Sequence, residues 1–172
     1  FDHVNELRRR LVRVVFSVVI GMLLSLAFTN TVIEYMKSAY GERLAILGPA
    51  DSVIIFFRVA LMLGVILAMP IITYHLFMFV VPGLTRKERR WLFTILPITT
   101  LLFLIGLAVT WFVLIPIYIN FLKNFQADIF VIQWTADEYI TFVTTVLLWH
   151  GVAFETPVIF YALGRLGIVT PS

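Results

Sequence analysis

Four long apolar segments constrain the fold of this chain more than any other feature of its sequence. They lie at about residues 11–28, 53–81, 91–121 and 139–163, and the connections between them hold most of the charge. Each segment is near or above the ~20 residues that an α-helix needs to cross the hydrocarbon core of a bilayer. A hydrophobic content of 61% with only 13% charged residues is also far from the composition of soluble domains. The sequence predicts an all-α integral membrane protein with four transmembrane helices in a single domain over residues 1–172.

Several function classes are disfavoured by what the sequence lacks. It contains no cysteine, which excludes disulfides, thiol catalysis and thiolate metal sites. It has no P-loop, no H-E-x-x-H and no G-x-S-x-G motif, and its three histidines lie on different segments without metal-ligand spacing. We therefore expect no enzymatic activity, no metal and no cofactor. The pI near 9.5 does not indicate nucleic-acid binding, because the cations gather at the ends of apolar segments.

The 13 cations are divided unequally between the two sides that alternating spans define. Nine fall on the side of the chain ends and of the connection at 82–90, and four fall on the other side. Because short loops rich in Lys and Arg stay in the cytoplasm, both chain ends and the 82–90 connection are predicted to be cytoplasmic. The outer connection at 29–52 carries apolar residues at helical spacing, which predicts a short amphipathic helix on the membrane surface.

Local signals mark helix starts and bends. The pattern S/T-x-x-E begins at Thr31, Thr85 and Thr135, and it predicts a capping box at each position. Pro49 resets the chain direction before the second segment, and Pro70 predicts a kink inside it because proline removes one backbone hydrogen bond. The third segment contains three further residues at which a helix bends: Pro97, Gly106 and Pro116.

One carboxylate, Glu155, lies well inside the fourth apolar segment. Placing a charged residue there costs ~2.5–3.5 kcal/mol on insertion scales, so the acid is a candidate functional group. Gly151 lies one turn before Glu155 on the same helix and leaves room for another helix or a peptide. Phe154 and Pro157 are neighbours of Glu155 in the sequence. Two readings stay open beside a partner-binding role. Glu155 could be a protonated or paired carboxyl that locks helix packing, with Arg58 or a residue of a helix missing from this chain as its partner. It could also be the proton site of an ion- or solute-coupled transporter.

Two acids on the predicted cytoplasmic side, Glu6 and Glu88, each precede a span and are surrounded by arginine. Glu6 is three and four residues before Arg9 and Arg10, which is the spacing of ordinary ion pairs within a helix. Glu88 closes the capping box that begins at Thr85. The residues alone favour these structural roles over ligand binding.

Several motifs, in order and across nearly the whole chain, resemble the TatC family, the multispanning subunit of the twin-arginine protein translocase. The resemblance rests on H-V-N-E-L-R at residues 3–8, M-P-I-I-T-Y at 69–74, F-V-V-P-G-L at 79–84, E-R-R at 88–90, G-V-A-F-E-T-P-V at 151–158 and G-I-V-T-P at 167–171, with Pro49 before the second span. Family members have six membrane helices with both ends in the cytoplasm. The resemblance therefore implies that this chain is a C-terminally truncated piece holding the first four.

The resemblance implies a receptor for twin-arginine signal peptides and the core of a translocase that exports folded proteins, driven by the proton gradient. It implies single-span TatA and TatB as partners, an oligomeric assembly, and a place in the prokaryotic cytoplasmic membrane or in a thylakoid or other organellar membrane. The sequence departs from the expected family pattern at His75, His150 and Asp51.

The resemblance also implies roles for individual residues. The signal-peptide site would comprise residues at the N-terminus and around the 82–90 connection: Glu6, Arg8, Phe79, Pro82, Leu84 and Glu88. Glu155 would contribute to partner contact. Since exposed carboxylate-arginine pairs contribute only ~0.2–1 kcal/mol, we hypothesise that Glu6 and Glu88 lie close together at the membrane interface, where a lower dielectric strengthens such pairs.

Overall fold

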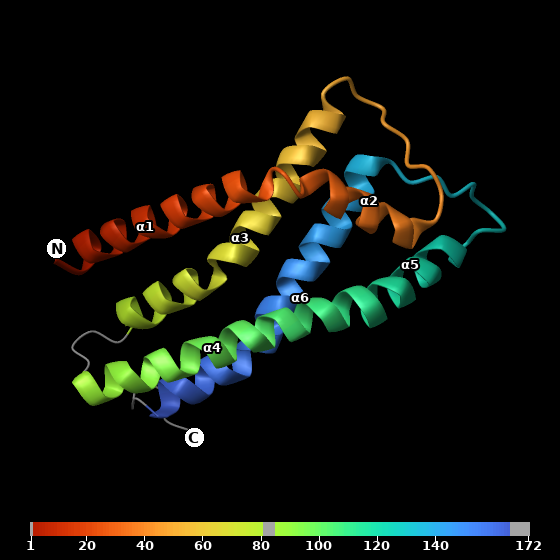
Figure 1. Ribbon diagram of the computed structural model, residues 1–172. Coiled ribbons are helices and arrows are strands. Elements are labelled where there is room, and N and C mark those ends of the chain that lie inside the picture. Colours follow the sequence, from red (N-terminus) through yellow and green to blue (C-terminus); the bar gives the residue numbers. More distant parts are fainter. Residues whose placement is uncertain (1, 81–84, 166–172) are drawn as a thin grey trace.

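The computed structural model describes residues 2–80 and 85–165, and the described part is built from helices (Figure 1). The elements are α1 (Asp2–Ser25), α2 (Thr29–Tyr40), α3 (Asp51–Val80), α4 (Arg86–Val109), the π-helical turn η1 (Thr110–Leu114), α5 (Ile115–Asn124) and α6 (Ala136–Arg165). Extended pairing among these residues is limited to one isolated bridge between Ala45 and Thr135. The predicted all-α fold is confirmed.

Three of the predicted spans correspond to helices that are long and apolar enough to cross a membrane: Asp51–Phe79, the continuous helix Arg86–Asn124, and Ala136–Arg165. The fourth candidate is the pair α1 and α2, which passes the same test only as a pair bent by 81° at the break. This bend agrees with the prediction that the segment after the first span leaves the direction of the span and forms a helix of its own.

The ends of the elements gather at two ends of the molecule. Figure 1 shows the starts of α1 and α4 and the end of α6 at one end, which we name the inner end. The opposite, outer end holds α2 and the connections that follow α2 and α5. This arrangement is the one expected for alternating spans, while the assignment of the inner end to the cytoplasm remains a prediction.

Helix starts follow the predicted caps at two of three positions. Thr85 and Glu88 form the complete capping box, with Thr85 Oγ1 accepting from the Glu88 amide at 3.2 Å and Glu88 accepting from the Thr85 amide at 3.2 Å. At Thr135 only the first of these bonds is present. The box predicted at Thr31 is wrong, because α2 begins earlier, at Thr29, whose hydroxyl donates to the Ser25 carbonyl across the tight turn from α1.

Helix bends have local causes in α3 and in the third span. Figure 1 shows that α3 changes direction along its length, as expected for a helix that contains Pro70. In the third span the irregularity is the π-turn η1, in which the Ile115 amide donates to the Thr110 carbonyl. This wider turn ends two residues before Pro116, which has no amide to continue the ordinary ladder of helix hydrogen bonds.

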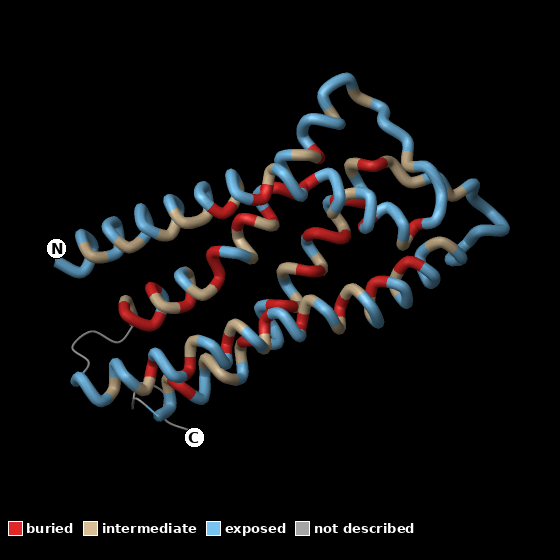
Figure 2. The backbone as a smooth tube through the Cα atoms, viewed as in Figure 1, coloured by how far each residue is buried: buried red, intermediate tan, exposed pale blue. Residues whose placement is uncertain are grey.

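Glycines set how closely the helices pack. A side chain at Gly64 on α3 would lie 2.7 Å from the Val18 carbonyl oxygen on α1, and one at Gly21 would lie 2.9 Å from the Gly64 carbonyl oxygen. The two backbones therefore touch. Figure 2 shows buried residues where helices face one another and exposed residues on the outward faces. Those outward faces carry many large apolar side chains, as expected for helices surrounded by lipid.

Candidate functional site

A chain of hydrogen bonds joins α1 to α3 at the inner end. The Arg10 Nε donates to Glu6 Oε1 at 3.1 Å, and Arg10 Nη1 lies 3.1 Å from His75 Nδ1. Because a guanidinium has only donors, His75 Nδ1 is the acceptor and its ring carries the proton on Nε2. The predicted pairing of Glu6 within its own helix is confirmed for Arg10.

The first turn of α1 is fixed to the last turns of α3 by a second contact. The rings of His3 and Phe79 stack with their centroids 4.4 Å apart and an angle of 25° between planes. Both residues therefore lie close to the Glu6–Arg10–His75 chain. His75 is buried, and the sequence marks it only as a departure from the expected family pattern. Its contact with Arg10 depends on the register of α1 against α3, which a local pattern does not reveal.

Arg8 faces a different surface of α1. It lines a shallow cavity of about 420 Å³ together with Asn5, Arg9, Val12 and Arg13. Arg8 makes no hydrogen bond or ion pair with the other described residues. The structure thus separates Arg8 from the Glu6 pair.

Glu88 lies in the first turn of α4 and has two sets of neighbours. One carboxylate oxygen, Oε2, accepts from the Thr85 amide in the capping box. The side chain also lines a small cavity of about 190 Å³ with Lys87, Trp91 and Arg165. The Arg165 guanidinium of α6 lies 5.8 Å from the Trp91 ring centroid. Glu88 therefore lies where α4 and α6 meet at the inner end.

Glu6 and Glu88 share the inner end but are not joined directly. Within residues 2–80 and 85–165, no hydrogen bond or ion pair connects them, and each has a partner in its own segment. Their proximity remains a hypothesis. Two further predicted site residues, Pro82 and Leu84, lie outside the described residues.

Glu155 is buried between α6 and α3, with 2% of its surface exposed. Its Oε1 accepts a hydrogen bond from Thr73 Oγ1 at 3.0 Å. The predicted partner Arg58 is wrong, since Arg58 bonds to Asp137 at 2.7 Å and to Thr141 near the outer ends of α3 and α6. Glu155 thus has a neutral partner, which sequence reasoning missed although Thr73 stands in one of the family motifs.

The neighbours of Glu155 pack against α4. A side chain at Gly151 would lie 2.7 Å from the ring of Phe103, and one at Gly106 would lie 2.8 Å from Phe154. The space predicted beside Gly151 is therefore filled by Phe103 of the same chain. Pro157 lies within α6 and is exposed.

His150 and Glu155 do not form a catalytic pair. The His150 Nδ1 donates to the Val146 carbonyl at 2.8 Å, and Nε2 lies 3.3 Å from the Tyr118 hydroxyl. Across the described part of the chain, no group of three or more His, Cys, Asp or Glu side chains is arranged to hold a metal.

Known proteins are similar to nearly the whole of this chain, both in sequence and in fold. The family described as Sec-independent protein translocase protein (TatC) matches residues 2–172. The TatC protein of Helicobacter pylori is 32% identical over 170 residues, which cover 99% of this chain and 67% of that protein. The chloroplast TATC protein of Arabidopsis thaliana is 35% identical, over 99% of this chain and 51% of that protein. A crystal structure of the twin-arginine translocase receptor TatC superposes with a TM-score of 0.83 and 31% identity, covering 98% of this chain and 77% of that one.

Proposed function

Because the chain belongs to the TatC family, we propose that its inner end receives the arginine pair of twin-arginine signal peptides. Family membership makes the chain a component of the Sec-independent protein translocase in a bacterial inner membrane or a thylakoid membrane. The family is a translocase component rather than a known enzyme family. The alternative of a secondary transporter that uses Glu155 is not favoured. The peptide, its contact residues and the partner subunits are the proposal.

The main observation in support of the proposal is that Glu6 already binds a guanidinium, that of Arg10. Arg10 Nε lies 3.1 Å from Glu6 Oε1, so this carboxylate is oriented for an arginine-type donor. Arg10 also has a second acceptor in His75. An incoming arginine can therefore take the place of Arg10 at Glu6 while Arg10 stays bound to the imidazole, which avoids leaving a cation without a partner.

Glu88 supplies a second carboxylate without giving up its helix cap. The cap uses Oε2, whereas Oε1 makes no hydrogen bond to a described residue. The capping and binding readings of Glu88 are therefore compatible. The cavity beside it includes the Trp91 ring, over which the Arg165 guanidinium lies in this structure, so a peptide arginine would stack on this ring by replacing Arg165.

The chemistry of the two cations explains why arginine would be selected. An exposed ion pair contributes only ~0.2–1 kcal/mol and does not distinguish arginine from lysine. A planar fork of donors that bonds one or two carboxylates and stacks on a ring does distinguish them. The first turn of α1, held by the stack of His3 on Phe79, would place this selective contact against α3.

Partner subunits and the energy source complete the proposal. We infer that TatA and TatB contact the exposed apolar faces of the helices, and that the proton gradient drives translocation. Glu155 would act from inside the α3–α6 packing, since 2% exposure leaves no surface for direct contact in this conformation. Phe154, on the same helix, is 36% exposed and would provide the neighbouring surface.

Site-specific photo-crosslinking tests the proposal. A photoreactive residue is placed at Lys87, and the purified protein in lipid nanodiscs is exposed to signal peptides that carry Arg-Arg or Lys-Lys. We expect strong crosslinking for Arg-Arg, weak crosslinking for Lys-Lys, and loss of the difference in Glu6→Gln. Glu34→Gln, which removes an exposed acid at the outer end, is the matched control and should behave as the wild type. Equal crosslinking of the two peptides to the wild type would contradict the proposal.

A further inference from the structure

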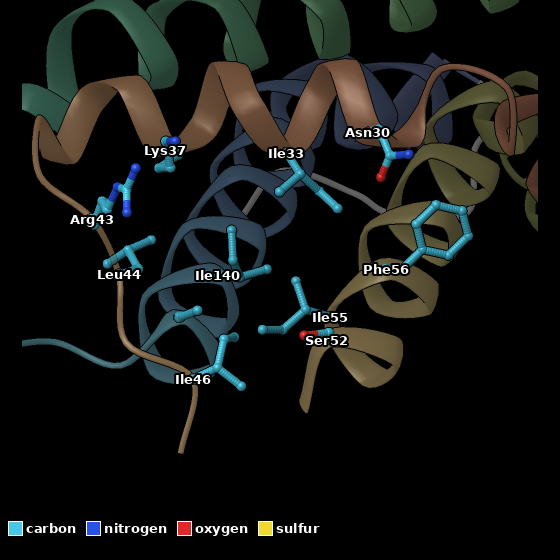
Figure 3. A pocket seen from close by; sticks show the side chains of 11 residues that line it. Asn30, Ile33, Lys37, Arg43, Leu44, Ile46, Ser52, Ile55, Phe56 and Ile140 are labelled. Atoms are coloured by element: carbon cyan, nitrogen blue, oxygen red, sulfur yellow. The ribbon is translucent and has the colours of Figure 1, made fainter. Parts of the chain in front are cut away.

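A cavity of about 550 Å³ opens at the outer end, away from the proposed peptide site. Four segments form it: α2, the connection after α2, the start of α3 and the start of α6 (Figure 3). This volume falls in the range of ~300–1,000 Å³ typical of ligand pockets. The cavity lies where the spans end, which is the depth expected for lipid headgroups.

The walls of the cavity are largely apolar. Ile33 of α2, Ile55 of α3 and Ile140 of α6 line it, and Figure 3 shows their side chains projecting into the space between the three helices. Leu44 and Ile46 of the connection close one side. Water in contact with these walls is unfavourable, so an occupant with a hydrocarbon part is favoured over a small hydrophilic solute.

Two cations lie together at one end of the cavity. Figure 3 shows Lys37 and Arg43 on the same side of the cavity and Asn30 toward the other side. Neither cation forms an ion pair with the other residues that the structure describes. The nearby Asp51 carboxylate is engaged, because it accepts from the Gly48 amide at 3.0 Å. The opening therefore has two positive charges available for an anion.

We propose that this cavity binds one anionic phospholipid, with its phosphate between Lys37 and Arg43 and the start of an acyl chain on the isoleucine walls. Charge complementarity selects the headgroup, and the apolar walls select the chain. A zwitterionic lipid is disfavoured because its quaternary amine would be repelled by the same two cations. Basic pockets between transmembrane helices on the cytoplasmic side of membranes bind anionic headgroups through the same attraction. The site does not depend on the proposed recognition of signal peptides.

A bound lipid would hold the outer end together. Its phosphate would connect α2 with the connection that follows it, and its chain would fill the space between α3 and α6. A ligand that binds only the folded protein stabilises it. The thermal stability of the purified protein should therefore rise with phosphatidylglycerol more than with phosphatidylcholine of the same chains.

Native mass spectrometry of the purified protein with these two lipids tests the proposal. Each cation near an anionic surface contributes about fivefold in affinity, so Lys37→Gln/Arg43→Gln should weaken phosphatidylglycerol binding by about 25-fold, to the level of phosphatidylcholine. The matched control Arg86→Gln/Lys87→Gln removes two cations from the inner end and should retain the preference. Ser52→Phe keeps both cations but narrows the apolar part, and it should weaken binding of both lipids.

The outcomes distinguish a specific lipid site from general charge attraction and from binding of a free anion. Equal binding of the two lipids to the wild type, or an unchanged preference in Lys37→Gln/Arg43→Gln, would overturn the proposal. An equal loss in the inner-end control would show general charge attraction and would also overturn it. Inorganic phosphate at the concentration of the lipid should not displace phosphatidylglycerol. Displacement would overturn the proposal as well, because it would show that the acyl chain has no part in binding.

Discussion

Replacement of Gly64 by alanine is expected to loosen α1 from α3 and to disturb the inner end through packing alone. The added methyl group would lie 2.7 Å from the Val18 carbonyl oxygen and 2.8 Å from the Met22 amide nitrogen. Both neighbours are backbone atoms, so a change of rotamer cannot relieve the contact. The two helices must move apart.

The size of the effect follows from two opposing terms. Overpacking of a close contact costs ~1–3 kcal/mol, while alanine favours a helix over glycine by ~0.8–1 kcal/mol. The net loss is then about 0–2 kcal/mol, which corresponds to a fall of up to several degrees in the midpoint of thermal unfolding. Gly151→Ala is the matched control. Its methyl group would meet side-chain atoms of Phe103 and Leu107 rather than backbone atoms, and side chains shift more easily than helix backbones, so its effect should be smaller.

Two assays report the result. Thermal unfolding in detergent gives the order of stability of the two variants and the wild type. A cysteine pair at His3 and Phe79 reports the position of α1, because the rings are 4.4 Å apart and the chain has no other cysteine. Gly64→Ala should slow crosslinking of this pair by a short bismaleimide, and Gly151→Ala should not. A Gly64→Ala variant with wild-type stability and unchanged crosslinking would refute the predicted backbone clash.

Three further substitutions test individual contacts. Glu88→Gln should keep the cap of α4, because an amide oxygen can still accept from the Thr85 amide. It should nevertheless reduce binding of the Arg-Arg peptide in the crosslinking assay. Unchanged binding would mean that Glu88 acts only as a cap. Thr73→Val should destabilise the protein by about 1–3 kcal/mol in thermal unfolding, because it leaves a buried polar group without its partner, whereas Thr73→Ser should be near wild type. His75→Leu should weaken peptide binding, because Arg10, once displaced from Glu6, would lose its second acceptor. His75→Gln keeps an acceptor and should retain the peptide affinity of the wild type. Equal peptide affinities for the two variants would exclude the replacement of Arg10 by a peptide arginine at Glu6.

Much of the fold could be predicted because its signals are local. The apolar segments reflect the thickness of a bilayer, so their number and approximate bounds follow from the sequence. The capping box at Thr85 and the pair of Glu6 with Arg10 also lie within one turn of a helix. These contacts need no knowledge of how the helices pack.

Contacts between helices were less accessible to sequence reasoning. Arg58 and Glu155 are opposite charges in facing spans, but the register of α3 against α6 places Arg58 beside Asp137 and Thr73 beside Glu155. The start of α2 at Thr29 depends on the sharp turn after α1, where a threonine hydroxyl bonds to the Ser25 carbonyl. The cavity at Lys37 and Arg43 arises from four separate segments. No single stretch of sequence indicates it.

A double-mutant cycle between the receptor and the peptide tests the central claim most directly. Binding of peptides with Arg-Arg or Lys-Lys is measured for the wild type and for Glu6→Gln in nanodiscs, which gives four affinities and one coupling energy. If Glu6 binds a peptide arginine, the two changes should be non-additive, with a coupling of about 0.5–3 kcal/mol. Additive changes would contradict the proposed recognition, because they would mean that Glu6 holds only Arg10 and that the arginine pair is recognised elsewhere.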